Sequence, residues 1–176
     1  EVRKLMRPYP LSAFYIIAIS MAQIYVGHIL RDASFFWALI LSYVFGAFLS
    51  HALFTQIHEA THDLVLKPRW ANHMMGFICN IGQGFPTYSS FRVFHMDHHL
   101  YLNDYERDAD LAFHKEAKWV GNSVIRKMIW FWFFGIIESI RPMKLKDAKL
   151  ITPLSAFNIV VIILTNIAIY YFAGPN

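Results

Sequence analysis

Five histidines stand in two closely spaced groups, and their spacing is typical of metal ligands. His58 and His62 are four positions apart, and His95 is followed by His98 and His99. On a helix, residues four apart lie one turn apart on the same face, so His58 and His62 can hold one ion together. In the second group a third imidazole points about 100° away from its neighbour, so this group can reach more than one ion.

The first group also spells H-E-x-x-H, from His58 through Glu59 to His62, which is the motif of zinc metalloproteases with glutamate as the general base. Such a protease needs one further ligand and an open position for water, so it leaves the second group without a role. An iron oxygenase would use all five histidines. Dehydrogenating an unactivated methylene requires an oxidant made from dioxygen at a redox-active metal, which zinc cannot supply. The paired groups therefore favour iron.

Nearby polar residues could support the histidines without binding metal. Each ligating imidazole leaves its second nitrogen to an acceptor, and Asp97, Asp108 and Asp110 are candidates, although loop carboxylates such as the last two are more often simply solvated. Glu138 is expected to pair with Arg141 three positions later. His51 lies on roughly the same face of its apolar stretch as the first group and could line a substrate channel, but a hydrogen-bonded role is the simpler interpretation. Three other histidines have no partner at chelating spacing and are expected to be structural or solvated: His28, His73 and His114.

Three long stretches without charged residues must position these groups. The chain has 176 residues, of which 56% are hydrophobic and only 16% charged, a composition that suits lipid better than water. The uncharged stretches are 11–30, 33–57 and 150–176. Each can cross a hydrocarbon core of about 30 Å as a helix. We therefore predict an all-α integral membrane protein with spans at about 11–30, 33–57 and 152–173.

The charges orient these spans. Of the 16 lysines and arginines, three precede the first span, Arg31 alone lies between the first two, and twelve fall within 58–149. By the positive-inside rule, 58–149 is a cytoplasmic metal-binding segment, whereas the Arg31-Asp32 turn and the Gly174-Pro175-Asn176 end face the other side. The net charge of +4 could also attract an acidic partner, but no nucleic-acid motif accompanies it. The single cysteine, Cys79, is expected to serve packing.

Two shorter apolar runs lie in the cytoplasmic segment. The run at 74–81, after Pro68 and before Gly82, predicts a short interfacial helix followed by a turn. The aromatic run at 128–137 predicts a second interfacial or re-entrant helix that Pro142 ends. Neither run is long enough to span the bilayer.

On these residues the sequence resembles the membrane fatty-acid desaturase superfamily, and within it the sphingolipid delta-4 (dihydroceramide) desaturases. The matching phrases are HEATHD at 58–63, NIGQGFPTYSSFRVFHMDHHLYL at 80–102, the pair Asp108 and Asp110, IRKMIW at 125–130, Arg141-Pro142, and, at the ends, EVRKLMRPYP and YYFAG. The gap of three residues in the first histidine group and the HMDHH phrase point to the sphingolipid branch, since the acyl-CoA branch usually has a gap of four.

The resemblance implies an endoplasmic-reticulum enzyme with two iron ions held by histidines, here His58, His62, His95, His98 and His99. It also implies dioxygen as co-substrate, cytochrome b5 as electron donor, and a lipid substrate, the dihydroceramide long-chain base, with hydroxylation as a known variant. The family has a fourth span and a third histidine box, which these 176 residues do not contain. We therefore expect 1–176 to be one incomplete desaturase domain that is inactive alone.

Two alternatives stay open at this point. The first is an intramembrane zinc metalloprotease that uses His58, His62 and Glu59, with a third ligand on a later span. The second is a membrane interaction protein that keeps the fold without the metal. Metal analysis of the full-length protein separates them, since the three hypotheses predict two irons, one zinc or no metal.

Overall fold

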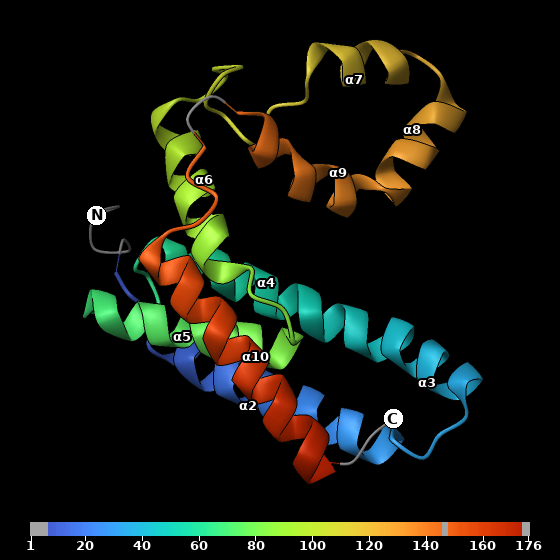
Figure 1. Cartoon of the computed structure of the whole chain (residues 1–176), viewed down its shortest axis with the longest axis vertical. Helices are drawn as coiled ribbons and strands as arrows, with labels where there is room; N and C mark the ends of the chain where they lie inside the picture. Colours follow the sequence, from blue (N-terminus) through green and yellow to red (C-terminus); the bar gives the residue numbers. More distant parts are fainter. Residues whose placement is uncertain (1–6, 146–147, 174–176) are drawn as a thin grey trace. The chain divides into compact units, whose positions relative to one another are not determined.

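The chain is helical throughout the part that the structure describes. The computed structural model describes residues 7–145 and 148–173, and no strand occurs among them (Figure 1). These residues form two compact units, one from the residues up to Ser89 together with those from Pro153 onward, and one from Ser90 to Thr152. The expectations for residues 1–6 and for the Gly174-Pro175-Asn176 end lie outside the described residues. The all-α membrane fold class is confirmed.

All three predicted spans are present in the first unit. Helix α2 covers Leu11–Leu30, and α10 covers Pro153–Ala173. Between them in sequence, α3 (Phe35–Leu41), the π-helical turn η1 (Ser42–Gly46) and α4 (Ala47–Thr61) form one uninterrupted helical segment. The three segments are long and apolar enough to cross a membrane, and most of their side chains are exposed, as lipid-facing surfaces require. The second span ends at Thr61 rather than Ile57, so His58 lies inside the helix.

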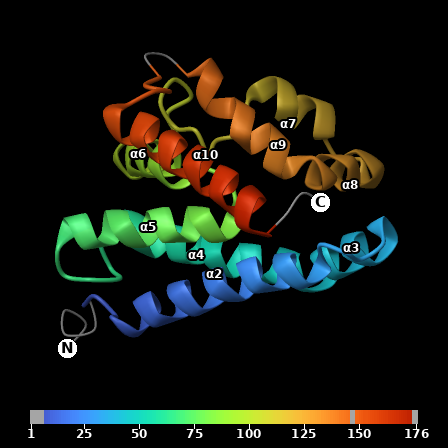
Figure 2. The same cartoon turned by 60° about the horizontal axis from the view of Figure 1, so that its bottom comes forward.

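Helix α5 (Arg69–Gln83) packs against α4 and α2, and α10 crosses it (Figures 1 and 2). It is longer than the apolar run at 74–81 indicated, because its first turn starts directly after Pro68, whose carbonyl accepts the N–H groups of Ala71 (3.0 Å) and Asn72 (3.3 Å). It ends at Gly84, which adopts the left-handed conformation (φ 72°). Cys79 is fully buried in this packing, as expected.

A connected set of polar side chains joins the helices of the first unit. Gln23 on α2 donates to the hydroxyl of Ser50 on α4 (2.9 Å), and Gln83 on α5 donates to the Ser50 carbonyl (3.0 Å). Asn80 donates to Asn158 of α10 across 3.1 Å, and both asparagines are fully buried. A bundle surrounded by lipid has no water for such groups, so they must satisfy one another. These bonds therefore fix which faces of the four helices meet.

Close contact between α5, α2 and α4 depends on Gly82. A Cβ atom at this position would lie 2.6 Å from Leu53 Cδ1 and 2.9 Å from Ser20 Cα. The second of these atoms belongs to the backbone of α2, which cannot move aside alone. The three helices can therefore approach this closely only because residue 82 has no side chain.

The second unit contains shorter helices. Helix α6 (Tyr88–Leu100) enters it from the first unit and is followed by α7 (His114–Val120), α8 (Val124–Trp132), α9 (Phe134–Ile140) and the 3₁₀ turn η2 (Arg141–Lys144). The prediction of one helix at 128–137 was wrong, because the backbone breaks at Phe133 (φ −99°, ψ 6°). The α9 helix ends before Pro142, as expected.

We predict that Gly82→Ala lowers the free energy of unfolding by about 1–3 kcal/mol, because the added methyl group overpacks the junction of three helices. Thermal unfolding of the full-length protein in detergent measures this effect. Gly27→Ala is the matched control, since residue 27 is a helical glycine with nothing within 4 Å of the added atom. Equal stability of the two variants would show that the close approach at residue 82 is not required.

Candidate metal centre

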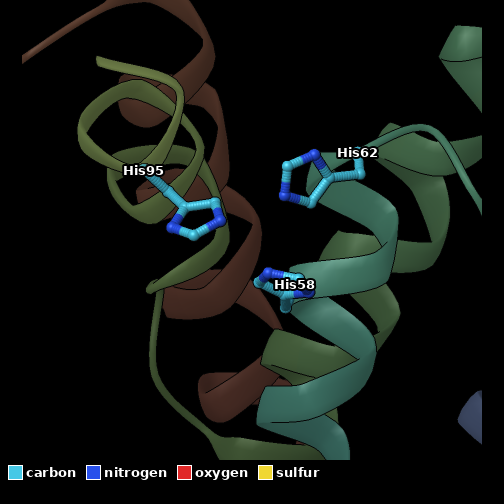
Figure 3. A group of neighbouring side chains, drawn as sticks. All are labelled: His58, His62 and His95. Atoms are coloured by element: carbon cyan, nitrogen blue, oxygen red, sulfur yellow. The ribbon is translucent and has the colours of Figure 1, made fainter. Parts of the chain in front are cut away.

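His58 and His62 form a ring pair at the end of α4 (Figure 3). Their ring centroids are 4.7 Å apart at an angle of 60°, and one nitrogen of each ring lies within 4.8 Å of the other. The helix ends at His62, and Asp63 then turns the chain in the left-handed conformation (φ 59°). The four-residue spacing therefore yields the expected pair of imidazoles one turn apart.

The remaining nitrogen of His58 has an acceptor. His58 Nδ1 lies 3.1 Å from Glu59 Oε1. A carboxylate at this distance favours the tautomer with hydrogen on Nδ1, which leaves Nε2 as the metal-binding atom. In this arrangement Glu59 orients a ligand, whereas the general base of a metalloprotease must face a water molecule on the metal. The geometry therefore weakens the protease hypothesis.

His95 and His99 lie together on α6, in the second unit. Their Nε2 atoms are 3.1 Å apart, and the rings meet nearly edge to face at 86°. Two nitrogens that each lie about 2.1 Å from one ion are separated by about 3.0–3.4 Å at octahedral or tetrahedral angles. The observed separation fits two ligands of one ion. The ring of Phe91 stacks on His95 at 4.7 Å, which holds the imidazole plane in place.

His98 faces a different partner, Asp108. Its Nδ1 lies 2.8 Å from Asp108 Oδ1, and Asp108 also accepts the main-chain N–H groups of Asn103 (2.9 Å) and Asp110 (2.9 Å). Burial opposes ionisation of Asp108, yet the bonds from His98, Asn103 and Asp110 outweigh it and hold the pKa below its usual value. An ionised Asp108 keeps hydrogen on His98 Nδ1 and leaves Nε2 for a metal.

The second carboxylate of this loop, Asp110, is close to the same histidines. Its Oδ2 atom lies 3.6 Å from His98 Nδ1 and 3.8 Å from His95 Nδ1. His98, Asp108 and Asp110 together place one possible ligand atom each within 4.8 Å. Because Asp108 already has three hydrogen-bond donors, we interpret it as a support for His98 rather than as a ligand.

A group of charged side chains lies beyond this loop, on α7, α9 and η2. Arg141 Nη2 lies 2.6 Å from Glu116 Oε1, and Arg141 Nη1 lies 2.7 Å from Glu138 Oε2. Partial burial raises the pKa of Glu138 to about 7, because desolvation and repulsion from Asp110 and Glu116 outweigh the positive charge of Arg141. The Glu116 carboxyl is also buried, but bonds from Arg141 and Trp130 lower its pKa. At neutral pH, Glu116 is therefore ionised, whereas Glu138 is partly protonated.

Several expectations from the sequence are now decided, while the metal-binding role of the five histidines stays a prediction. The Glu138–Arg141 pair is confirmed, and Asp108 serves as an acceptor for His98. The expectation of a solvated Asp108 was wrong, because the residue is 3% exposed. His73 has the structural role expected, with Nδ1 2.8 Å from the Tyr88 hydroxyl. His114 likewise stacks on a neighbouring tyrosine ring.

The contacts of Glu116 and Trp130 were not predicted from the sequence. Glu116 stands 25 positions before Arg141, and Trp130 donates to it from 14 positions away. No periodic pattern links residues at these separations. Only Glu138, three positions before Arg141, could be linked to this arginine from the sequence.

Comparison with known proteins decides the family. The sequence matches the fatty acid desaturase family over residues 34–175. The chain belongs to this family. Among the relatives of this desaturase chain, sphingolipid delta(4)-desaturase DES1 of Homo sapiens is 32% identical over 99% of the chain and 54% of its own length. The protein of the same name in Gallus gallus is 31% identical over 100% of the chain and 54% of its own length.

The match extends to plants but not to any solved structure. A DES1-like sphingolipid delta(4)-desaturase of Oryza sativa subsp. japonica is 33% identical over 83% of the chain and 44% of its own length. No solved structure matches the desaturase chain. The chain spans about half the length of the curated relatives it matches.

We predict that Asp108→Asn in the full-length protein weakens metal binding by about 10- to 100-fold, because an amide can offer its NH₂ group to His98 and no longer enforces the tautomer. Titration of the metal-free protein with Co²⁺, followed by absorption, measures the affinity. Asp104→Asn is the control, since this exposed carboxylate of the same loop contacts only the nearby N–H of Glu106 among the bonds described. Equal affinities for both variants would contradict a supporting role for Asp108.

We predict that Glu138 destabilises the protein as the pH rises. Its pKa of about 7 in the folded state exceeds the ordinary value of 4.5, so folding favours the protonated form. Its unfavourable contribution is therefore absent in acid, grows as the pH rises and is complete above pH 7. Between about pH 5 and about pH 8 the free energy of unfolding should fall by up to about 3 kcal/mol relative to Glu138→Gln. Chemical unfolding of both proteins measures it, and parallel pH profiles would contradict the prediction.

Proposed function

We propose that the full-length protein is an iron-dependent lipid desaturase or hydroxylase, with His58, His62, His95, His98 and His99 among the ligands of two iron ions. The observation that carries the proposal is the paired arrangement of these imidazoles in a chain of the fatty acid desaturase family. His58 and His62 form one pair, and His95 and His99 form the other. For four of the five, a carboxylate or a second ring nitrogen lies within 3.1 Å of a nitrogen.

The residues fit iron by their chemistry. Imidazole nitrogens suit iron as well as zinc, but a set of five histidines exceeds what one tetrahedral zinc site accepts. Bound iron would supply the oxidising power, drawn from dioxygen, that removal of hydrogen from an unactivated methylene requires. The protein residues provide the rest. Glu59 and Asp108 fix the tautomers of His58 and His98, and the stacked Phe91 ring holds the plane of His95.

The substrate we propose is the long-chain base of dihydroceramide. The relatives named as sphingolipid delta(4)-desaturases support this choice. Desaturation takes two hydrogens from adjacent methylenes and reduces dioxygen to two waters, so two further electrons and two protons must be supplied. We propose cytochrome b5 as the electron donor and the endoplasmic reticulum as the location, with the histidines on the cytoplasmic side. The apolar surfaces of α2, α4 and α10 are compatible with a substrate that enters from the bilayer.

We also propose that the metal centre is incomplete within these 176 residues. Two irons each require several nitrogens, and five imidazoles do not complete both coordination shells. The remaining ligands would come from the third histidine box of the family. A protein restricted to residues 1–176 should therefore be inactive, and the full-length protein active. Ceramide desaturation by residues 1–176 with stoichiometric iron would contradict this proposal.

Metal analysis of the full-length protein tests the function. We expect two irons per chain and conversion of a dihydroceramide substrate that depends on dioxygen and reductant. His62→Gln and His99→Gln should each abolish conversion and reduce bound iron, because each removes a ligand. His114→Gln is the control, since this exposed histidine stacks on Tyr105 and has no place in either group.

The alternatives predict different results from the same analysis. A zinc metalloprotease would hold one zinc and cleave peptides, and Glu59→Gln would abolish cleavage while the zinc remained. A membrane interaction protein without a metal centre would contain no stoichiometric metal. Either result would contradict the desaturase proposal.

A further inference from the structure

Arg141 is buried in the second unit and is held by charge. Its side chain is 3% exposed, although arginine is among the residues least often buried. The guanidinium donates to Glu116 through Nη2 (2.6 Å) and Nε (3.4 Å), and to Glu138 through Nη1 (2.7 Å). A buried arginine with so many bonds costs desolvation energy, so its location indicates a specific task.

One bond of Arg141 does not go to a carboxylate. Its Nη1 donates to the main-chain carbonyl of Asp110, 3.0 Å away and 31 positions earlier in sequence. The main-chain N–H of the same residue donates to Asp108 Oδ1. Asp110 is thus held from both sides, by Arg141 at its carbonyl and by Asp108 at its amide.

Asp108 in turn is hydrogen-bonded to His98. The same oxygen, Oδ1, lies 2.8 Å from His98 Nδ1, and the other oxygen accepts the amide of Asn103. Three hydrogen bonds therefore connect the guanidinium to the imidazole through residue 110: Arg141 to the Asp110 carbonyl, the Asp110 N–H to Asp108, and Asp108 to His98. Each link is a hydrogen bond of ordinary length between groups of the second unit.

The other side of Arg141 is fixed as well. Trp130 of α8 donates its indole N–H to Glu116, and the ring of Phe134 lies 5.6 Å beneath the guanidinium carbon. Glu116 therefore locks Arg141 against α7 and α8. Glu138 is the weaker partner, because its pKa of about 7 leaves it partly protonated at neutral pH. Glu116 and Asp110 are the contacts that matter.

We propose that Arg141 is a positioning residue of the metal centre, which clamps the loop of Asp108 and Asp110 so that Asp108 orients His98. This inference rests on the proposed function, in which His98 is a ligand. Arginine is suited to this role because its planar fork reaches two acceptors at once, whereas the single nitrogen of lysine cannot span Glu116 and the Asp110 carbonyl. Through Arg141, the α7–α9 segment thus stabilises the loop that orients His98.

Three variants of the full-length protein test the clamp. Arg141→Lys keeps the charge but loses the fork. The triple variant Arg141→Met, Glu116→Gln, Glu138→Gln also loses the clamp. It leaves no unpaired buried charge, so we expect it to fold. Glu138→Gln alone keeps the clamp. Arg126→Lys is the matched control, because this exposed arginine of the same unit contacts the Trp119 carbonyl.

Two measurements are made on metal-free protein. Co²⁺ titration should show an affinity about 10- to 100-fold lower for Arg141→Lys and for the triple variant. Hydrogen exchange should show the amides of residues 101–112 exchanging about tenfold faster in both. Glu138→Gln and Arg126→Lys should match the wild type in both measurements. Wild-type affinity and exchange in the triple variant would overturn the proposal.

A double variant separates positioning from general stability. If Arg141 acts through Asp108, Arg141→Lys should weaken Co²⁺ binding little further in the Asp108→Asn background. A loss of equal size in both backgrounds would overturn the proposal. The hydrogen-exchange measurement needs no metal, so it tests the clamp independently of metal binding. A wild type that binds no metal would contradict the proposed function, not the clamp.

Discussion

The hydrogen bond from His98 to Asp108 is the interaction around which the second unit is organised. A metal-binding histidine is held in a defined orientation when its other nitrogen has a fixed acceptor. Asp108 can be that acceptor because two main-chain amides of its own loop hold its carboxylate and keep it ionised despite burial. The Asp110 carbonyl of the same loop accepts a hydrogen bond from Arg141. Hydrogen bonds and charge therefore connect the loop both to His98 and to Arg141.

In the first unit, the end of α4 has to be held in place within a bundle whose outer surface is apolar. Lipid supplies no driving force for one apolar helix to prefer another. Polar side chains supply it here. Gln23, Ser50 and Gln83 join α2, α4 and α5, while Asn80 and Asn158 join α5 and α10. Gly82 then permits the close approach of three helices. The His58 and His62 pair stands at the end of a helix held in this way.

The parts of this arrangement that repeat along the chain could be predicted from the sequence. Uncharged stretches long enough to cross a bilayer located all three spans, and the four-residue spacing of His58 and His62 gave the ring pair. Helix ends were less accurate, since the second span continues to Thr61 and the aromatic run breaks at Phe133. The contacts of Glu116 with Arg141 and Trp130 could not be predicted, because they join residues with no periodic relation and depend on how short helices pack. For the same reason the choice of Asp108 as acceptor over Asp97 or Asp110 needed coordinates.

The most direct test of this account is an experimental structure of the full-length protein with iron bound. We expect a nitrogen of each of five histidines to lie about 2.1–2.2 Å from one member of a single pair of irons: His58, His62, His95, His98 and His99. This expectation would be contradicted by a structure in which the group at 58–62 and the group at 95–99 lie apart, or in which their rings face away from a common metal pair.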